Sequence, residues 1–72
     1  MFIRLKQLRD ANNLTQKDIA IFLKITPPQY SLYETGKRPI PIFLLSRLAK
    51  FYNTSIDFLM DLTDEQKPYP AK

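Results

Sequence analysis

Residues 15 to 36 read TQKDIAIFLKITPPQYSLYETG, and this stretch decides the fold. Thr15 can cap a helix with its hydroxyl, and Asp18, three positions later, stands where a capping box places an acid. The apolar residues that follow recur at helical spacing and predict one buried face: Ile19, Ala20 and Leu23. Lys24 and Ile25 then form a tight turn.

The second helix of the pair has its own start signal, inward face and end signal. Thr26 caps it, and Pro27 takes the first helical position, where a missing N–H costs nothing. Tyr30 and Tyr33 form its inward stripe; they could instead stack on nucleic-acid bases, but their spacing favours the core. Gly36 ends the helix, as a left-handed terminal residue should be glycine. Two helices this short and close must cross at a steep angle, which is the helix-turn-helix arrangement.

The composition excludes several classes of site. The 72 residues include no cysteine and no histidine, which rules out disulfides, common zinc sites and Ser-His or Cys-His nucleophile pairs. We therefore expect no enzyme, no metal and no cofactor. No apolar run is long enough for a membrane span, and charges follow Met1-Phe2-Ile3 directly, unlike a signal peptide. The expected compartment is the cytoplasm.

The positive charge is unevenly distributed along the chain. Up to Asn53 there are nine lysines and arginines against three acids, whereas from Thr54 onward two lysines stand against four acids. A basic body with a mildly acidic tail suggests that the body binds an anionic partner. Many soluble domains carry a similar net charge of +4 and bind nothing charged, so this signal is modest.

Apolar periodicity predicts three further helices, over about residues 2–12, 41–52 and 55–61. We expect an all-α domain of five helices over residues 1–61, followed by an extended tail over residues 62–72. The helix-turn-helix motif itself covers about residues 15–35. The residues expected to face the core in the three further helices are Leu5, Leu8, Ile42, Leu45, Leu48, Ala49, Tyr52, Ile56 and Leu59.

Several short motifs lie at characteristic spacings between about residues 3 and 60. They are Leu8-Arg9, Leu14-Thr15-Gln16, Ile19-Ala20, Tyr33-Glu34-Thr35-Gly36-Lys37-Arg38, Leu48-Ala49 and Ser55-Ile56-Asp57-Phe58-Leu59. Together they resemble the Cro and phage-repressor, or Xre-type, helix-turn-helix family, and most closely small regulators of low-GC Gram-positive bacteria and their phages. The resemblance implies a lambda-repressor-like fold whose third helix enters the major groove of DNA.

The resemblance also implies roles for individual residues. The positions that match base contacts are Pro28, Gln29 and Leu32. The positions expected at phosphates are Thr15, Gln16, Lys17, Thr26, Ser31, Thr35, Lys37 and Arg38. Arg9 and Glu34 match a buried structural salt bridge, although Arg9 could also contact phosphate. Lys37 and Arg38 could form an ordinary solvated loop, but their place directly after the reading helix favours phosphate contact.

The reading helix departs from the family at three positions. Pro27 and Pro28 stand where donor side chains are common, and Leu32 stands where a polar reader is common. Gln29 is then the only side chain of the helix able to pair bidentately with adenine. Pro28 and Leu32 could contact thymine methyl groups. We therefore expect either an A·T-leaning operator or low specificity.

The leading hypothesis is a DNA-binding transcriptional regulator, expected to be a repressor and a homodimer on a palindromic operator. The expected partners are double-stranded DNA and a second copy of the chain, without a small-molecule effector. The dimer surface is expected on the fourth and fifth helices, with the tail around Pro68, Tyr69 and Pro70 folded across it, at Phe43, Leu44, Phe51, Phe58 and Met60. The alternative is a protein-interaction module, such as the antitoxin of a toxin pair or a degenerate helix-turn-helix domain.

Overall fold

The computed structural model describes residues 3–67, and this part of the chain is all helical, without strands. The five helices are α1 (Ile3–Ala11), α2 (Gln16–Leu23), α3 (Pro27–Glu34), α4 (Ile42–Phe51) and α5 (Ile56–Leu59). The predicted all-α, five-helix fold is confirmed, with α1, α4 and α5 slightly shorter than expected. None of the helices in residues 3–67 has the length and apolar character needed to cross a membrane.

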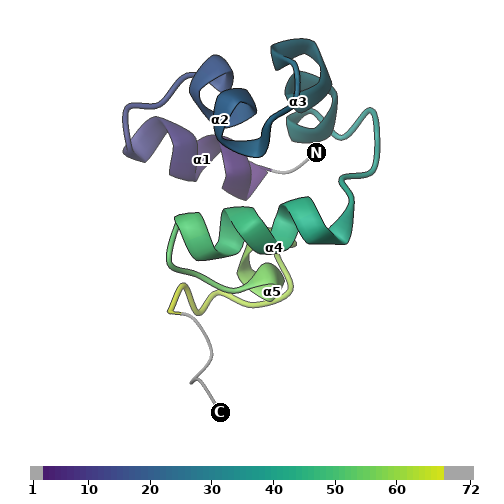
Figure 1. Cartoon of the computed structure of the whole chain (residues 1–72). Helices are drawn as coiled ribbons and strands as arrows, with labels where there is room; N and C mark the ends of the chain where they lie inside the picture. Colours follow the sequence, from purple (N-terminus) through teal and green to yellow (C-terminus); the bar gives the residue numbers. More distant parts are fainter. Residues whose placement is uncertain (1–2, 68–72) are drawn as a thin grey trace.

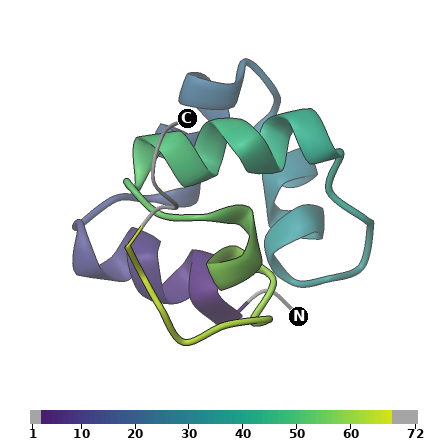
Figure 2. The same cartoon turned by 90° about the horizontal axis from the view of Figure 1, so that it is seen from below.

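The helices form a layered arrangement around one core. Helices α1, α2 and α3 lie on one side of α4, and α5 packs against α4 on the other side (Figure 1). Helices α2 and α3 pack on each other, and Figure 2 shows that their axes run in different directions. Helix α1 also contacts α3 and α5, so the N-terminal helix connects the helix-turn-helix pair to the C-terminal helices.

The predicted caps hold the ends of α2. The Thr15 hydroxyl accepts a hydrogen bond from the Asp18 N–H at 3.1 Å, and an Asp18 carboxylate oxygen accepts one from the Thr15 N–H at 2.8 Å. This hydrogen bond from the Thr15 backbone lowers the pKa of Asp18. At the other end, Lys24 takes a left-handed conformation with φ of 61°, which turns the chain towards α3.

Tyr30 and Tyr33 both point into the core, as predicted. Their neighbours in the core are Leu5, Leu8, Ile19, Ala20, Leu23, Leu44, Leu45, Leu48, Ala49, Tyr52, Phe58 and Leu59. The hydroxyls of Tyr30 and Tyr52 are buried, and neither has a hydrogen-bond partner within residues 3–67. Burial raises the pKa of Tyr52 to about 12; burial and, next, the negative charge of Glu34 raise that of Tyr30. The Glu34 carboxylate is near the Tyr30 hydroxyl but not in hydrogen-bonding geometry.

Helix α4 buries a wider face than its sequence pattern predicted. Leu44, expected on the dimer surface, is buried, and so is Phe58 on α5. Leu44 was misassigned because α4 has neighbours on more than one side, including α5 (Figure 1). Phe58 was misassigned because α5 also contacts α1, whose Arg4 covers the Phe58 ring. Conversely, Ile42 was expected in the core and is 64% exposed, because it is the first residue of α4 and the buried part of that helix begins only at Leu44. Ile40, just before the helix, packs against the core instead.

The described part of the predicted tail is not helical and is fixed to the domain by Arg4. The Arg4 guanidinium binds Asp61 and Asp64, each at 2.9 Å, and lies 4.2 Å from the centre of the Phe58 ring. The Thr54 hydroxyl donates to the Gln66 carbonyl. These contacts pull the chain after α5 back over the first and last helices. The expected fold-over by Pro68, Tyr69 and Pro70 lies outside the described residues.

The unpartnered hydroxyl of Tyr30 yields a test of the core. Tyr30→Ala should lower the free energy of unfolding by about 3–5 kcal/mol, because it removes a fully buried ring and leaves a cavity. Tyr30→Phe keeps the ring and removes a hydroxyl without a partner, so it should change stability by less than about 1 kcal/mol. Urea unfolding followed by circular dichroism measures both variants. Equal losses for both would contradict the placement of the ring.

Candidate nucleic-acid interface

Helix α3 has a sharply divided surface. Tyr30, Tyr33 and Glu34 are buried on its inner side. Pro28 and Leu32 are four residues apart and fall on the opposite side, where Pro28 is exposed and Leu32 half-buried. The positions predicted to contact bases therefore lie on a face that an approaching ligand can reach, while the other face fixes the helix to the core.

Gln29 is engaged in a second capping box, which the sequence analysis did not recognise. Its side-chain oxygen accepts hydrogen bonds from the Thr26 N–H at 3.0 Å and the Thr26 hydroxyl at 3.2 Å. In return, the Gln29 backbone N–H donates to the Thr26 hydroxyl oxygen at 3.3 Å. Bidentate pairing with adenine uses the same carboxamide oxygen, so the expected adenine readout by Gln29 is incompatible with this arrangement. The spacing Thr-x-x-Gln was the missed signal.

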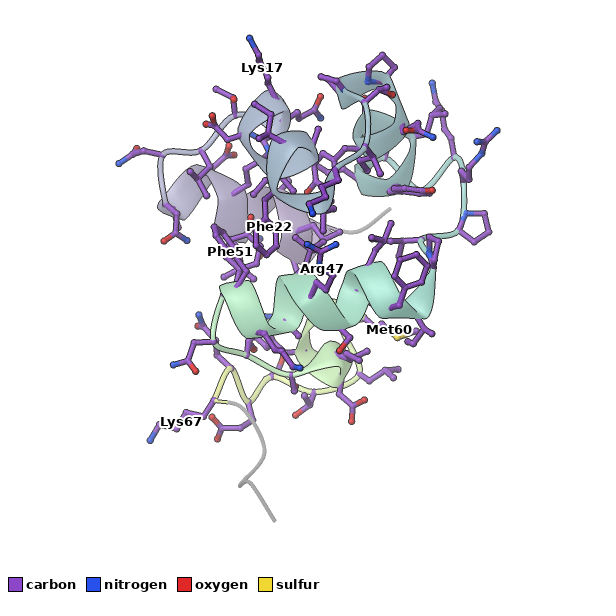
Figure 3. The ribbon with its side chains drawn as sticks, viewed as in Figure 1. Lys17, Phe22, Arg47, Phe51, Met60 and Lys67 are labelled. Atoms are coloured by element: carbon purple, nitrogen blue, oxygen red, sulfur yellow. The ribbon has the colours of Figure 1, made fainter. Side chains whose placement is uncertain are left out.

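The two helix N-termini differ in what they offer a phosphate. Gln16 and Lys17 begin α2, so their backbone N–H groups lie at the positive end of that helix. Lys17 is exposed and points away from the body of the protein (Figure 3). Helix α3 begins with Pro27 and Pro28, neither of which has an N–H group. Of these two N-termini, the one of α2 is therefore the better anion site.

The loop after α3 presents two cations. Gly36 adopts φ of 79°, a conformation open to glycine without steric penalty, and the Arg38 N–H donates to the Leu32 carbonyl at 3.2 Å. These features fold the loop back on the end of α3. Lys37 and Arg38 are both exposed on this loop. The Arg38 backbone bond to Leu32 keeps the predicted phosphate-contacting loop close to the end of α3.

Two of the hydroxyls expected at phosphates donate within the protein. The Thr35 hydroxyl donates to the Ser31 carbonyl at 2.8 Å, and the Thr26 hydroxyl donates to Gln29. Phosphate oxygens accept hydrogen bonds, so these hydroxyls can serve them only if their present bonds break. Thr15 is exposed and Ser31 half-buried. The exposed cations and the N-terminus of α2 are therefore the better candidates for phosphate binding.

The predicted salt bridge between Arg9 and Glu34 is confirmed. The Arg9 Nε and Nη2 atoms donate to the two carboxylate oxygens, each at 3.0 Å, and Nη1 donates to the Leu14 carbonyl at 2.8 Å. The side chains are 12% and 4% exposed. Burial alone would raise the pKa of Glu34, but the hydrogen bonds and charge of Arg9 outweigh it and lower the pKa. Gln16, expected to grip a phosphate, donates to the same carboxylate at 3.4 Å.

Arg47 connects α4 to the end of α2, a role that the sequence pattern did not indicate. Its Nη2 atom donates to the Phe22 carbonyl at 3.1 Å, and its guanidinium lies 5.3 Å from the centre of the Phe22 ring. The Phe22 ring in turn packs on Phe51 with ring centres 4.7 Å apart. Figure 3 shows these three side chains between the helix-turn-helix layer and α4. The cluster holds the motif against α4.

Comparison with known proteins identifies one family and several relatives. The helix-turn-helix family HTH_3 matches residues 5–59. The chain is 37% identical over 65 residues to the uncharacterized HTH-type transcriptional regulator YobD of Bacillus subtilis, covering 90% of the chain and 58% of that protein. It is 36% identical over 63 residues to the SPbeta prophage-derived uncharacterized HTH-type transcriptional regulator YonR of the same organism, covering 88% and 58%. The chain thus spans somewhat over half of these curated relatives. No solved structure matches it.

Removal of Arg9 tests the buried pair. Arg9→Ala should lower the free energy of unfolding by about 3–5 kcal/mol, because it leaves the Glu34 carboxylate buried without its countercharge. Lys6→Ala is the matched control: it removes the same charge from an exposed position on α1 and should leave stability nearly unchanged. Thermal unfolding of both variants at neutral pH provides the comparison. An Arg9→Ala protein that melts with the wild type would show that the pair does not stabilise the fold.

Proposed function

The chain belongs to the helix-turn-helix family of Cro- and Xre-type regulators, and we propose that it is a DNA-binding transcriptional regulator that places α3 in the major groove. The observation that carries the proposal is the division of α3. Its inner side is anchored in the core, and its outer side is flanked by the exposed cations Lys37 and Arg38. An α-helix fits the major groove, and cations beside it reach the phosphates that line the groove.

We propose that the regulator is a repressor. A protein that occupies a DNA site excludes other proteins from that site by its bulk alone. Repression therefore requires only the DNA-binding surface already described, whereas activation requires a further surface for the transcription machinery. Expression of a reporter gene placed behind the bound site tests this proposal, with a fall in expression as the expected result.

A protein-interaction module is the competing function, and one observation favours it. The outer face of α3 carries the Pro28 ring and Leu32 in place of the usual polar readers. A face of this kind could bury itself against another protein. The two functions differ in their dependence on salt, because counterion release accompanies binding to DNA and not burial of an apolar face.

The proposed homodimer uses the exposed apolar side chains at the start of α4 and the end of α5. Ile42 and Phe43 are each 64% exposed, and Met60 is 44% exposed. Met60 lies below the N-terminal end of α4 in Figure 3, and α5 packs on α4. This surface replaces the predicted set: Leu44 and Phe58 are excluded by burial, and Phe51, at the opposite end of α4, packs on Phe22. A reading helix of eight residues contacts few bases, so two copies on a palindrome double the readout, with their reading helices about 34 Å apart.

The dependence of binding on salt tests the DNA-binding function. The logarithm of the binding constant should fall linearly with the logarithm of salt concentration, by about 0.9 for each cation-phosphate contact. Replacing both Lys37 and Arg38 by alanine should flatten this slope by about 2 and weaken all sequences alike. Gel shifts with genomic fragments over a range of salt concentrations measure the effect. A wild-type protein that binds no DNA, or binds independently of salt, would favour the interaction module.

A pair of matched variants tests the dimer surface. Phe43→Glu should abolish self-association, because it places a charge in the proposed apolar interface. Ile21→Glu introduces the same charge at a residue of α2 that is 65% exposed, and it should leave association unchanged. Sedimentation at micromolar concentration distinguishes the variants. A wild-type monomer that binds an isolated half-site at full affinity would exclude the dimer.

A further inference from the structure

We propose that the outer face of α3 reads DNA chiefly through thymine methyl groups, with Pro28 and Leu32 as the residues that determine specificity. This inference rests on the proposed DNA-binding function and names the chemical group that the reading helix recognises. In the major groove the thymine methyl is the apolar feature of the base edges.

The first step is that the polar groups of α3 are largely engaged within the protein. The Gln29 side-chain oxygen accepts two hydrogen bonds from Thr26. The Thr35 hydroxyl donates to the Ser31 carbonyl. Proline side chains neither donate nor accept hydrogen bonds. Apart from the Ser31 hydroxyl, which is half-buried and has a single oxygen, no polar side chain of α3 is then left to offer the paired donor and acceptor that reads adenine.

The second step is that two apolar side chains occupy that face at a suitable spacing. Pro28 and Leu32 are separated by four residues, which places their Cβ atoms about 6 Å apart on one side of a helix. Successive bases of B-DNA rise by about 3.4 Å, so these two side chains reach base pairs within about two steps of each other. A pair of thymines at that separation would bury both side chains in a single docking position.

The third step is that the remaining polar reader adds little discrimination. The Gln29 amide nitrogen can still donate a hydrogen bond while its oxygen stays in the capping box. A single hydrogen-bond donor can bind guanine N7 or O6, adenine N7 or thymine O4. It therefore discriminates only against cytosine, whose major-groove edge presents a donor. Burial of methyl groups by Pro28 and Leu32 is then the main source of preference between bases.

Replacing thymine by uracil in the DNA tests this inference, because uracil lacks only the methyl group. The bound site is first selected from a random DNA pool and then synthesised with uracil at single thymine positions. Each contacted thymine should lose about 4-fold in affinity, the equivalent of about 0.8 kcal/mol for one buried methyl-sized group. Uracil at positions outside the contacted pair should have no effect.

Protein variants assign the effect to the proposed side chains. Leu32→Ala, with folding checked by circular dichroism, should weaken binding to thymine DNA and abolish the penalty for uracil at one of the two positions. Pro28→Ala should do the same at the other position. Lys37→Ala should weaken thymine and uracil DNA by the same factor, because it contacts phosphate.

The possible outcomes distinguish a failure of methyl readout from a failure of the proposed DNA-binding function. Selective binding to one site with equal affinity for thymine and uracil would overturn methyl readout and leave DNA binding intact. A uracil penalty that persists in both Leu32→Ala and Pro28→Ala would also overturn it. Failure to bind any DNA would overturn the proposed function and this inference together.

Discussion

The arrangement of the helix-turn-helix pair depends on one buried carboxylate. Glu34 stands at the end of α3 and receives two hydrogen bonds from Arg9 of α1 and one from Gln16 of α2. Tyr30 lies one turn earlier on the same inner side of α3. The ion pair and this ring together fix the rotation of α3 about its axis. That rotation decides which residues of α3 point outward, and hence which ones a ligand can meet.

Three of the four arginines serve the fold rather than a partner. Arg4 binds Asp61 and Asp64 and covers the Phe58 ring, Arg9 pairs with Glu34, and Arg47 binds the Phe22 carbonyl. Only Arg38 remains exposed on the loop after α3. The eleven lysines and arginines of the sequence therefore overstate the number of cationic side chains that can face DNA. The lysines carry most of the remaining positive charge, and Lys17 and Lys37 are the ones beside the proposed interface.

The features that sequence predicted well are those made by residues close together in the chain. The caps by Thr15 and Thr26 depend on hydrogen bonds across three residues, so their spacing was sufficient. The Arg9–Glu34 pair spans 25 residues and was predicted only through the family resemblance. The errors at Ile42 and Leu44 arose because periodicity gives the direction of a face and not the neighbours that cover it. The capping box between Gln29 and Thr26 was missed because a glutamine at this position also suits base readout, and only the base-contact interpretation was considered.

The capping box at the start of α3 restricts how this protein can change its DNA preference by mutation. Gln29 lies in the first turn of α3 and is also a predicted base contact, so most substitutions there that would provide a new reader also remove a helix cap. Among the usual residues, glutamate retains the reciprocal bond with Thr26, but it places a negative charge near the DNA. New specificity is therefore more accessible through Pro28 and Leu32, whose side chains make none of the cap bonds. Substitution of Gln29 therefore affects the stability of α3 together with recognition, whereas substitution of Pro28 or Leu32 leaves the cap intact.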